Sequence, residues 1–286
     1  MRTFGIAGLQ LPLAEGDNLE YIGAEIAAVC ARLPWVQMVV IGELASFGAS
    51  LTYAQPLPGP AEERLRTIAR QQKIWLLPGS LYERCGNHVF NTAPVIAPDG
   101  SVVTRCRKLF PFLPYERGVE PGDELCVFDI PQVGRFGVSI CYDMWFPETT
   151  RSLCWLGAEV ILHPTMTNTV DRDTELAIAR ASAAINQCYF LDVCVAGSLG
   201  NGRSIACGPG GEVLYQAGMG RDVWALELDL DQVQRTRETG WNRLGQTLKS
   251  FRDSRIAFPA YQAGVAPSPA LDRYGALRTP SSREID

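Results

Sequence analysis

The stretch Arg135–Arg151, RFGVSICYDMWFPETTR, constrains the fold most because it joins a buried-looking strand to a helix through a single cysteine. Apolar residues alternate with small or polar ones in Phe136–Ile140, which predicts a strand with one strongly apolar face. Pro147 and Glu148 suit the first turn of a helix. Cys141 is therefore expected between a strand end and a helix start, where backbone N–H groups favour a thiolate. A cysteine that only packs in the core is the competing interpretation.

The composition argues against a nucleic-acid-binding or membrane protein. The chain has 286 residues, of which 47% are hydrophobic and 20% are charged, so it can bury a substantial core. Its net charge is −5 and it contains no basic run. This balance favours a small neutral substrate over nucleic acid or an anionic membrane. The N-terminus shows no signal-peptide pattern or long apolar span, so we expect a soluble, cytoplasmic protein.

The cysteines and histidines predict neither a disulfide framework nor a metal site. Nine cysteines are scattered through apolar segments, with no CxxC pair and an odd total, which is typical of reduced thiols. His88 and His163 are the two histidines, and no clustered Cys/His spacing occurs. We therefore expect no metal and no cofactor, and there is little material for a Cys–His dyad.

Two halves with the same order of elements are predicted within residues 1–230. In each half, three strands alternate with helices and a hairpin with a Pro/Gly-rich turn follows. The strands are expected at residues 4–10, 38–41 and 74–81 in the first half and at 135–140, 159–163 and 189–196 in the second; the hairpins surround residues 98–100 and 208–211, and a last strand covers 223–228. Two such mixed sheets, each with helices on one face, predict a four-layer α-β-β-α sandwich. Residues 231–286 are expected to form a C-terminal helix and an extended, proline-rich arm.

Three polar residues occupy structurally parallel places in this order. Glu43 follows the buried strand at 38–41, Lys108 follows the second strand of the first hairpin, and Cys141 ends the strand at 135–140. A solvated strand terminus would also explain Glu43, and a surface position would explain Lys108. The loop at residues 44–59 is long for a simple connection, which favours a site next to Glu43.

This arrangement resembles the carbon–nitrogen hydrolase (nitrilase) superfamily over roughly residues 4–230. The most specific part is Gly137–Glu148, GVSICYDMWFPE, which is similar to the nucleophile motif of that family. Lys108 with the preceding arginine matches its lysine motif, and Glu43 matches its first glutamate. Two further stretches, Arg107–Asp123 and Asp171–Gln187, resemble the amidase and formamidase branch.

The sequence departs from the family pattern near two of these residues. The first glutamate commonly follows proline in the family, whereas here it follows Gly42. Leu109-Phe110-Pro111 stands where the lysine motif often has leucine and histidine. Neither departure removes a reacting group.

The chemistry of the residues agrees with the roles that the resemblance implies. A thiol with a pKa of about 8.5 is only a few per cent thiolate at neutral pH, so it needs a base or positive surroundings. With histidine scarce, we expect Glu43 to be the base and Cys141 the nucleophile. Lys108 and the backbone N–H of Tyr142 would stabilise the oxyanion. The resemblance implies that Glu116 is a second carboxylate that orients the substrate or the lysine.

A small pocket with aromatic walls is expected around these groups. Its predicted lining comprises Phe112, Tyr115, Tyr142, Trp145, Thr165 and Met166. The expected reaction is hydrolysis of a small carboxamide through a Cys141 thioester. A nitrilase, an N-carbamoyl-amine hydrolase, an acyltransferase using the same thioester, or a catalytically silent binding member are the alternatives. The family also implies a homodimer or higher homo-oligomer, with residues 231–286 at the interface.

Overall fold

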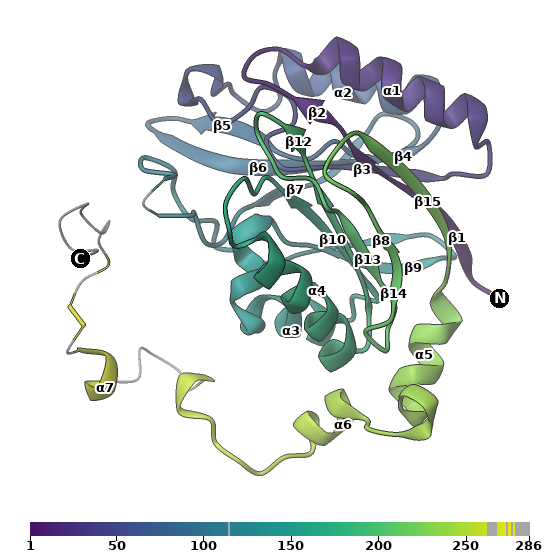
Figure 1. Ribbon diagram of the computed structural model, residues 1–286, viewed down its shortest axis with the longest axis vertical. Helices are drawn as coiled ribbons and strands as arrows, with labels where there is room; N and C mark the ends of the chain where they lie inside the picture. Colours follow the sequence, from purple (N-terminus) through teal and green to yellow (C-terminus); the bar gives the residue numbers. More distant parts are fainter. Residues whose placement is uncertain (114, 262–267, 273, 276, 278–286) are drawn as a thin grey trace.

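Two mixed β-sheets pack face to face, and a pair of helices covers the outer face of each sheet (Figure 1). The computed structural model describes residues 1–113, 115–261, 268–272, 274–275 and 277. The predicted four-layer α-β-β-α sandwich is confirmed. Buried apolar residues form separate clusters between the sheets and beneath each helix pair, so every layer contact is a hydrophobic core.

The first sheet has seven strands in the order β15-β1-β3-β4-β6-β5, with β7 also pairing with β6. Its strands are β1 (Thr3–Gln10), β3 (Met38–Ile41), β4 (Trp75–Leu77), β5 (Leu81–Cys85), β6 (His88–Ile96), β7 (Val102–Arg107) and β15 (Asp222–Asp229). Helices α1 (Leu19–Arg32) and α2 (Pro60–Gln72) cover it. Their buried apolar residues recur at helical spacing, for example Ile22, Ile26 and Val29 in α1.

The second sheet has six strands in the order β14-β13-β11-β10-β9-β8. They are β8 (Cys126–Ile130), β9 (Gly134–Val138), β10 (Val160–Thr165), β11 (Tyr189–Cys194), β13 (Ile205–Cys207) and β14 (Val213–Gln216). Helices α3 (Pro147–Trp155) and α4 (Arg172–Asn186) cover its outer face. The short strands β2 (Pro12–Leu13) and β12 (Ala196–Gly197) pair with each other and link the two halves.

The two halves repeat one topology. In the first sheet β1, β3 and β4 are parallel neighbours, and β6 and β7 continue the sheet in antiparallel pairing. In the second sheet β9, β10 and β11 are parallel, and β13 and β14 continue it in antiparallel pairing. The pseudo-repeat predicted from the order of elements is therefore present in the architecture.

Three features differ from the prediction. The run expected as one strand at residues 74–81 is divided at Gly79, whose φ of 80° turns the chain, and β5 follows as a separate edge strand. The last strand, β15, leaves the second half and pairs antiparallel with β1 in the first sheet. Cys106 of β7 and Cys126 of β8 form a disulfide, so the expectation of reduced thiols is wrong for these two residues.

Aromatic rings mark the centre of the core between the sheets. Phe136 of β9 lies 5.5 Å from Phe4 of β1 and 5.6 Å from Phe128 of β8, measured between ring centroids. Phe4 and Phe136 are fully buried. Because Phe4 belongs to the first sheet and Phe136 to the second, this contact ties the two halves directly and fixes how their strand ends face one another.

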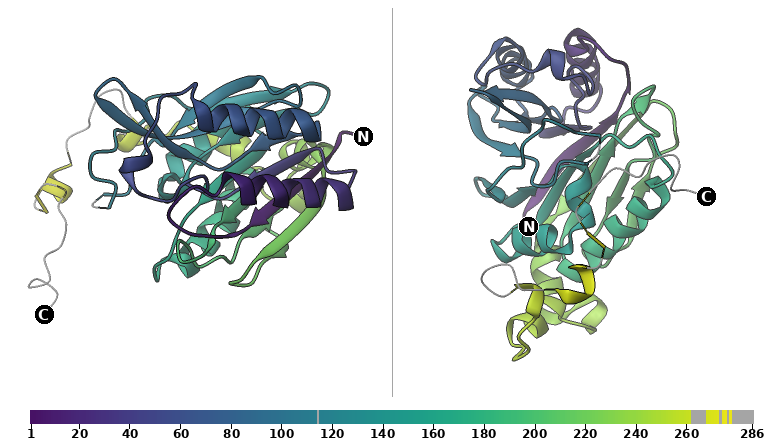
Figure 2. Two further views of the ribbon diagram at one scale, coloured as in Figure 1. Left: turned by 90° about the horizontal axis from the view of Figure 1, so that it is seen from above. Right: turned by 90° about the vertical axis from the view of Figure 1, so that its left-hand side faces the viewer.

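The C-terminal segment leaves the sandwich after β15 (Figure 2). It contains α5 (Leu230–Thr239), α6 (Thr247–Arg252) and α7 (Pro269–Asp272). The predicted helix after residue 230 corresponds to α5. The part of the predicted arm that contains Pro267 and Pro280 lies outside the described residues. None of the described helices has the length and hydrophobicity needed to cross a membrane.

Candidate active site

Cys141 lies at a sharp turn between the second sheet and helix α3. The chain leaves β9 and enters a 3-10 helix, η2 (Cys141–Trp145), before α3 begins. Cys141 has a φ of 48°, in the left-handed region that residues with a Cβ rarely adopt. Such a conformation costs about 1–3 kcal/mol and persists only where neighbouring contacts hold it. At this turn, which we call the elbow, the fold therefore imposes the direction of the Cys141 side chain.

Asp143 holds this elbow in place. Its Oδ2 accepts a hydrogen bond from the N–H of Ile140 at 2.9 Å, and its Oδ1 accepts one from the N–H of Phe110 at 2.8 Å. Asp143 is 1% exposed, and burial raises the pKa of its carboxyl to about 7. The side chain thus fastens the loop that follows Lys108 to the turn that carries Cys141.

Glu43 enters the same site from the first sheet. It follows β3, and its N–H donates to the carbonyl of Thr165 in β10 at 3.2 Å, so the two sheets meet at this point. The preceding residue must be small: a Cβ at Gly42 would lie 2.7 Å from the Val195 side chain and 2.9 Å from the Thr165 carbonyl oxygen. Close packing between the sheets explains the glycine found here.

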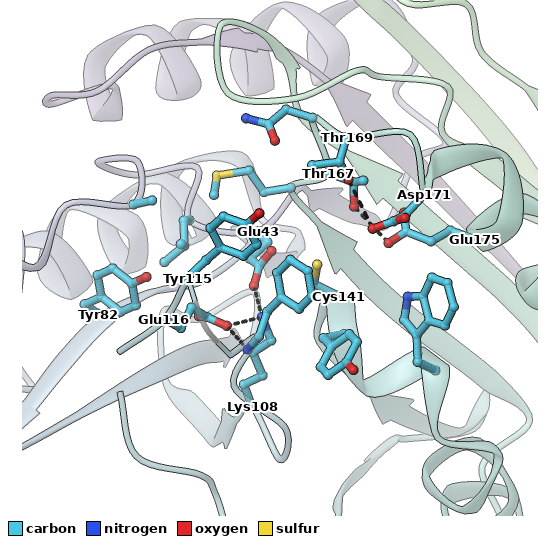
Figure 3. Close-up of a pocket in the computed structure, with 17 residues that line it drawn as sticks. Glu43, Tyr82, Lys108, Tyr115, Glu116, Cys141, Thr167, Thr169, Asp171 and Glu175 are labelled. Carbon is cyan, nitrogen blue, oxygen red and sulfur yellow. Dashed lines mark hydrogen bonds and ion pairs between the residues drawn. The ribbon is translucent and has the colours of Figure 1, made fainter. Parts of the chain in front are cut away.

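A buried network connects Glu43, Lys108 and Glu116 (Figure 3). The Lys108 ammonium lies 2.8 Å from Oε1 of Glu43 and 2.6 Å from Oε2 of Glu116. The side chain of Asn91 donates to Oε1 of each of these carboxylates at 2.9 Å. The four residues are at most 9% exposed. One amide and one ammonium therefore set the positions of both carboxylates.

Burial and charge shift the pKa values of the three central groups. Burial alone would lower the pKa of Lys108, but Glu43, Cys141 and Glu116 outweigh it and raise that pKa well above its ordinary value. Burial raises the pKa of Glu43, which Lys108 partly offsets. Burial, with the charge of Glu43, also raises the pKa of Cys141 well above its ordinary value. These shifts favour an ammonium on Lys108 and a neutral thiol on Cys141, whereas the position at a helix start favours a thiolate.

These groups face one cavity of about 240 Å³. The predicted residues Glu43, Lys108, Glu116 and Cys141 line it, together with Phe112, Tyr115, Tyr142, Trp145 and Met166. Thr165 does not line it, which corrects the prediction for that residue. Because β10 continues through Thr165, its side chain is fully buried, and its carbonyl binds the N–H groups of Glu43 and Val195 instead.

Several site residues carry little signal in the sequence. Asn91 lies within β6, where it looks like an ordinary polar strand residue. Tyr82, Thr167, Asp171 and Glu175 also line the cavity. Asp171 and Glu175 stand at the start of α4, where acidic residues are usual because they complement the helix dipole. Only the position of α4 beside the elbow shows that these two side chains face Cys141 (Figure 3).

The described residues contain no group of three or more His, Cys, Asp or Glu side chains arranged to hold a metal ion. The thiol of Cys141, the ammonium of Lys108 and the two carboxylates that bind this ammonium share one cavity. Such a set can transfer a proton from sulfur to a carboxylate and stabilise a developing negative charge.

Comparison with known proteins agrees with this geometry. Residues 14–238 match the family model described as carbon-nitrogen hydrolase. Omega-amidase NIT2 of Xenopus tropicalis is 31% identical over 202 residues, which cover 65% of this chain and 72% of the relative. Omega-amidase NIT2 of Mus musculus is 29% identical, covering 83% of this chain and 93% of the relative.

Solved structures show the same fold. Nit3 of Saccharomyces cerevisiae, a member of the nitrilase superfamily, has a TM-score of 0.76 with 26% identity, covering 83% of this chain and 94% of that one. A cysteine-to-alanine variant of the Nesterenkonia AN1 amidase has a TM-score of 0.73 with 25% identity, covering 82% and 94% of the two chains.

The charge arrangement predicts how Cys141 responds to a change at Glu43. Glu43→Gln removes a negative charge that raises the pKa of the thiol and leaves the Lys108 charge that lowers it. The thiolate fraction at pH 7 should rise, and Cys141 should react several-fold faster with iodoacetamide because the thiolate is the nucleophile. Peptide mass spectrometry measures the rate, with the exposed thiol of Cys85 as an internal control. A slower reaction at Cys141 with an unchanged rate at Cys85 would contradict this electrostatic account.

Proposed function

Because the chain belongs to the carbon–nitrogen hydrolase (nitrilase) superfamily, we propose that this hydrolase cleaves the C–N bond of a small carboxamide through a thioester on Cys141. One observation carries the proposal. Lys108 bridges Glu43 and Glu116 at 2.8 and 2.6 Å in the cavity that Cys141 also faces. A carboxylate, an ammonium and a thiol therefore share one cavity, with the ammonium in direct contact with the carboxylates, and this supports the proposal.

In the first step, Glu43 takes the thiol proton as the sulfur of Cys141 attacks the amide carbonyl carbon. The raised pKa of Glu43 suits this role, because a base with a pKa closer to neutrality can both accept the proton and return it. The thiol of Cys141 faces the same cavity as Glu43, which supports a direct transfer of the proton between them. The neutral thiol is therefore activated only when substrate is present to receive the sulfur.

The attack creates a tetrahedral intermediate whose oxygen is negatively charged. Lys108 and the N–H of Tyr142, in the first turn of η2, are the donors that would stabilise it. Each such donor lowers the barrier by about 3–4 kcal/mol in comparable sites. Protonated Glu43 then gives its proton to the amide nitrogen, the C–N bond breaks, and ammonia leaves with the thioester remaining on Cys141.

Water completes the cycle. Glu43, again a carboxylate, takes a proton from a water molecule that attacks the thioester carbonyl. The second tetrahedral intermediate collapses, releasing the carboxylic acid and the sulfur of Cys141, which recovers its proton from Glu43. Glu116 takes no part in these transfers. Its bonds to Lys108 and to the N–H of Phe112 instead hold the ammonium and the aromatic wall in position.

The proposal predicts an acyl-enzyme that depends on Cys141. Incubation with a panel of short amides, nitriles and N-carbamoyl amines should give ammonia from the amides, and intact-mass measurement should show an added acyl group. Cys141→Ala should show neither. Cys154→Ala, a buried thiol of α3, is the matched control and should keep turnover. Ammonia release from nitriles or carbamoyl compounds alone would replace the amidase assignment with one of those activities.

The state of Glu43 predicts the pH dependence. Turnover requires its carboxylate, so kcat/KM should fall as the pH drops through a pKa raised above the ordinary value of 4.5. Asn91→Ala removes a hydrogen-bond donor to that carboxylate, so the fall of kcat/KM at low pH, its acid limb, should move to still higher pH. Asn87→Ala, in the exposed turn between β5 and β6, should leave the limb in place. An acid limb at or below 4.5 would exclude Glu43 as the base.

We also propose that the protein forms a homodimer or higher homo-oligomer through the segment after residue 230. Large apolar side chains remain exposed along this segment, namely Leu244, Ile256, Phe258 and Tyr261. Light scattering should give at least twice the monomer mass. Truncation after residue 240 should reduce the mass to that of a monomer, and an unchanged mass would place the interface elsewhere.

A further inference from the structure

Carboxylates outnumber cations around the cavity that holds Cys141. Among the described residues that line it, four are acidic and Lys108 is the one basic residue; the acidic residues are Glu43, Glu116, Asp171 and Glu175. The Lys108 ammonium is already bound to Glu43 and Glu116. A substrate carboxylate would therefore enter without a free cation to pair with it, at the cost of burying an unpaired charge.

The acidic residues that do not bind Lys108 lie on the other side of Cys141. Figure 3 shows Asp171 and Glu175 grouped with Thr167 and Thr169, away from the Lys108 network. Thr167 donates to Oε1 of Glu175 at 3.0 Å, and Thr169 donates to Oδ2 of Asp171 at 3.3 Å. The cavity thus has a catalytic end and an acceptor-rich end, with the nucleophile between them.

Asp171 differs from Glu175 in lacking a cationic partner. Glu175 is paired with the buried Arg172 at 3.1 Å, and that arginine also binds Asp192 at 2.7 Å. The next nearby arginine, Arg203, is engaged by Asp173 at 2.7 Å. No salt bridge reaches Asp171 from the described residues, and its side chain is half-buried. Its negative charge is therefore available to a ligand in the cavity.

Aromatic rings form part of the wall of this cavity. The ring of Phe112 lies 5.1 Å from that of Tyr115 and 4.8 Å from that of Tyr142, which in turn lies 6.4 Å from Trp145. All four line the cavity. Aromatic faces attract cations, and the attraction grows when the cation is desolvated. A carboxylate without a salt-bridge partner, in a cavity that is also lined by aromatic rings, is a combination that recognises an ammonium group.

We propose that the preferred substrate is a short amide with a positively charged ammonium group at the end opposite the amide, and that Asp171 is the residue that selects it. The inference rests on the proposed function, because the amide must lie at Cys141 for the ammonium to reach Asp171. The cavity volume of about 240 Å³ suits such a chain, since it is smaller than a typical drug-sized site of about 300–1,000 Å³.

Three amides that differ only at the far end test this selection. They are 4-aminobutanamide, pentanamide and glutaramate, which carry an ammonium, a methyl and a carboxylate on the same chain, together with the three analogues that are two methylenes longer. The value of kcat/KM should be highest for the ammonium amide and lowest for the carboxylate amide at one or both lengths. A single charge-assisted hydrogen bond accounts for a preference of about tenfold or more over the methyl amide.

Variants of two neighbouring acidic residues distinguish direct recognition of the ammonium by Asp171 from an effect of the overall negative charge of this region. Asp171→Asn should lower the ratio of kcat/KM between the ammonium and methyl amides by about tenfold, mainly through KM. Asp173→Asn changes the exposed acidic residue two positions along α4 and should leave that ratio unchanged. If the methyl or carboxylate amide is preferred, or if Asp171→Asn keeps the ratio, this inference is wrong while the amidase assignment stands. If no amide releases ammonia, both fail.

Discussion

The site depends on the burial of one ammonium between two carboxylates. Lys108 is 1% exposed, and an ammonium without partners at such a place would cost several kcal/mol in lost solvation. Glu43 and Glu116 supply the compensating charge, and each of them needs Lys108 for the same reason. None of the three charges is stable there without the others. Asn91, which binds both carboxylates, fixes the geometry in which this mutual dependence is satisfied.

The repeated topology explains why these groups meet. Glu43 follows β3, a central strand of the first sheet, and Cys141 follows β9, one of the parallel strands of the second sheet. Packing the two sheets face to face brings these strand ends together, and the bond from the N–H of Glu43 to Thr165 shows how closely they approach. Lys108 follows β7, the hairpin strand of the first half. Each of the three side chains therefore follows the end of a strand, and a strand in a packed sheet holds such a position accurately.

The sequence predicts the sandwich and the central groups because both have local signals. Strand and helix periods specify the alternation of elements, and Cys141 stands at a recognisable junction between them. The features that could not be predicted depend on contacts between residues that are far apart in the sequence. Asn91 and Asp171 look ordinary in their own elements, and the pairing of Cys106 with Cys126 requires knowing that β7 and β8 are neighbours. The neutral state of the Cys141 thiol likewise follows from its burial beside Glu43, which no local pattern reveals.

The pairing of β15 with β1 has a consequence for how the protein is made. β1 is synthesised about 210 residues before its antiparallel partner, which runs from Asp222 to Asp229. Translation proceeds at about 5–20 residues per second, so the backbone N–H and C=O groups on this side of β1 stay unpaired for many seconds. Molecules interrupted before residue 222 would therefore lack the strand that closes the sheet bearing Glu43, so chaperone binding or aggregation at β1 is the main hazard of incomplete synthesis.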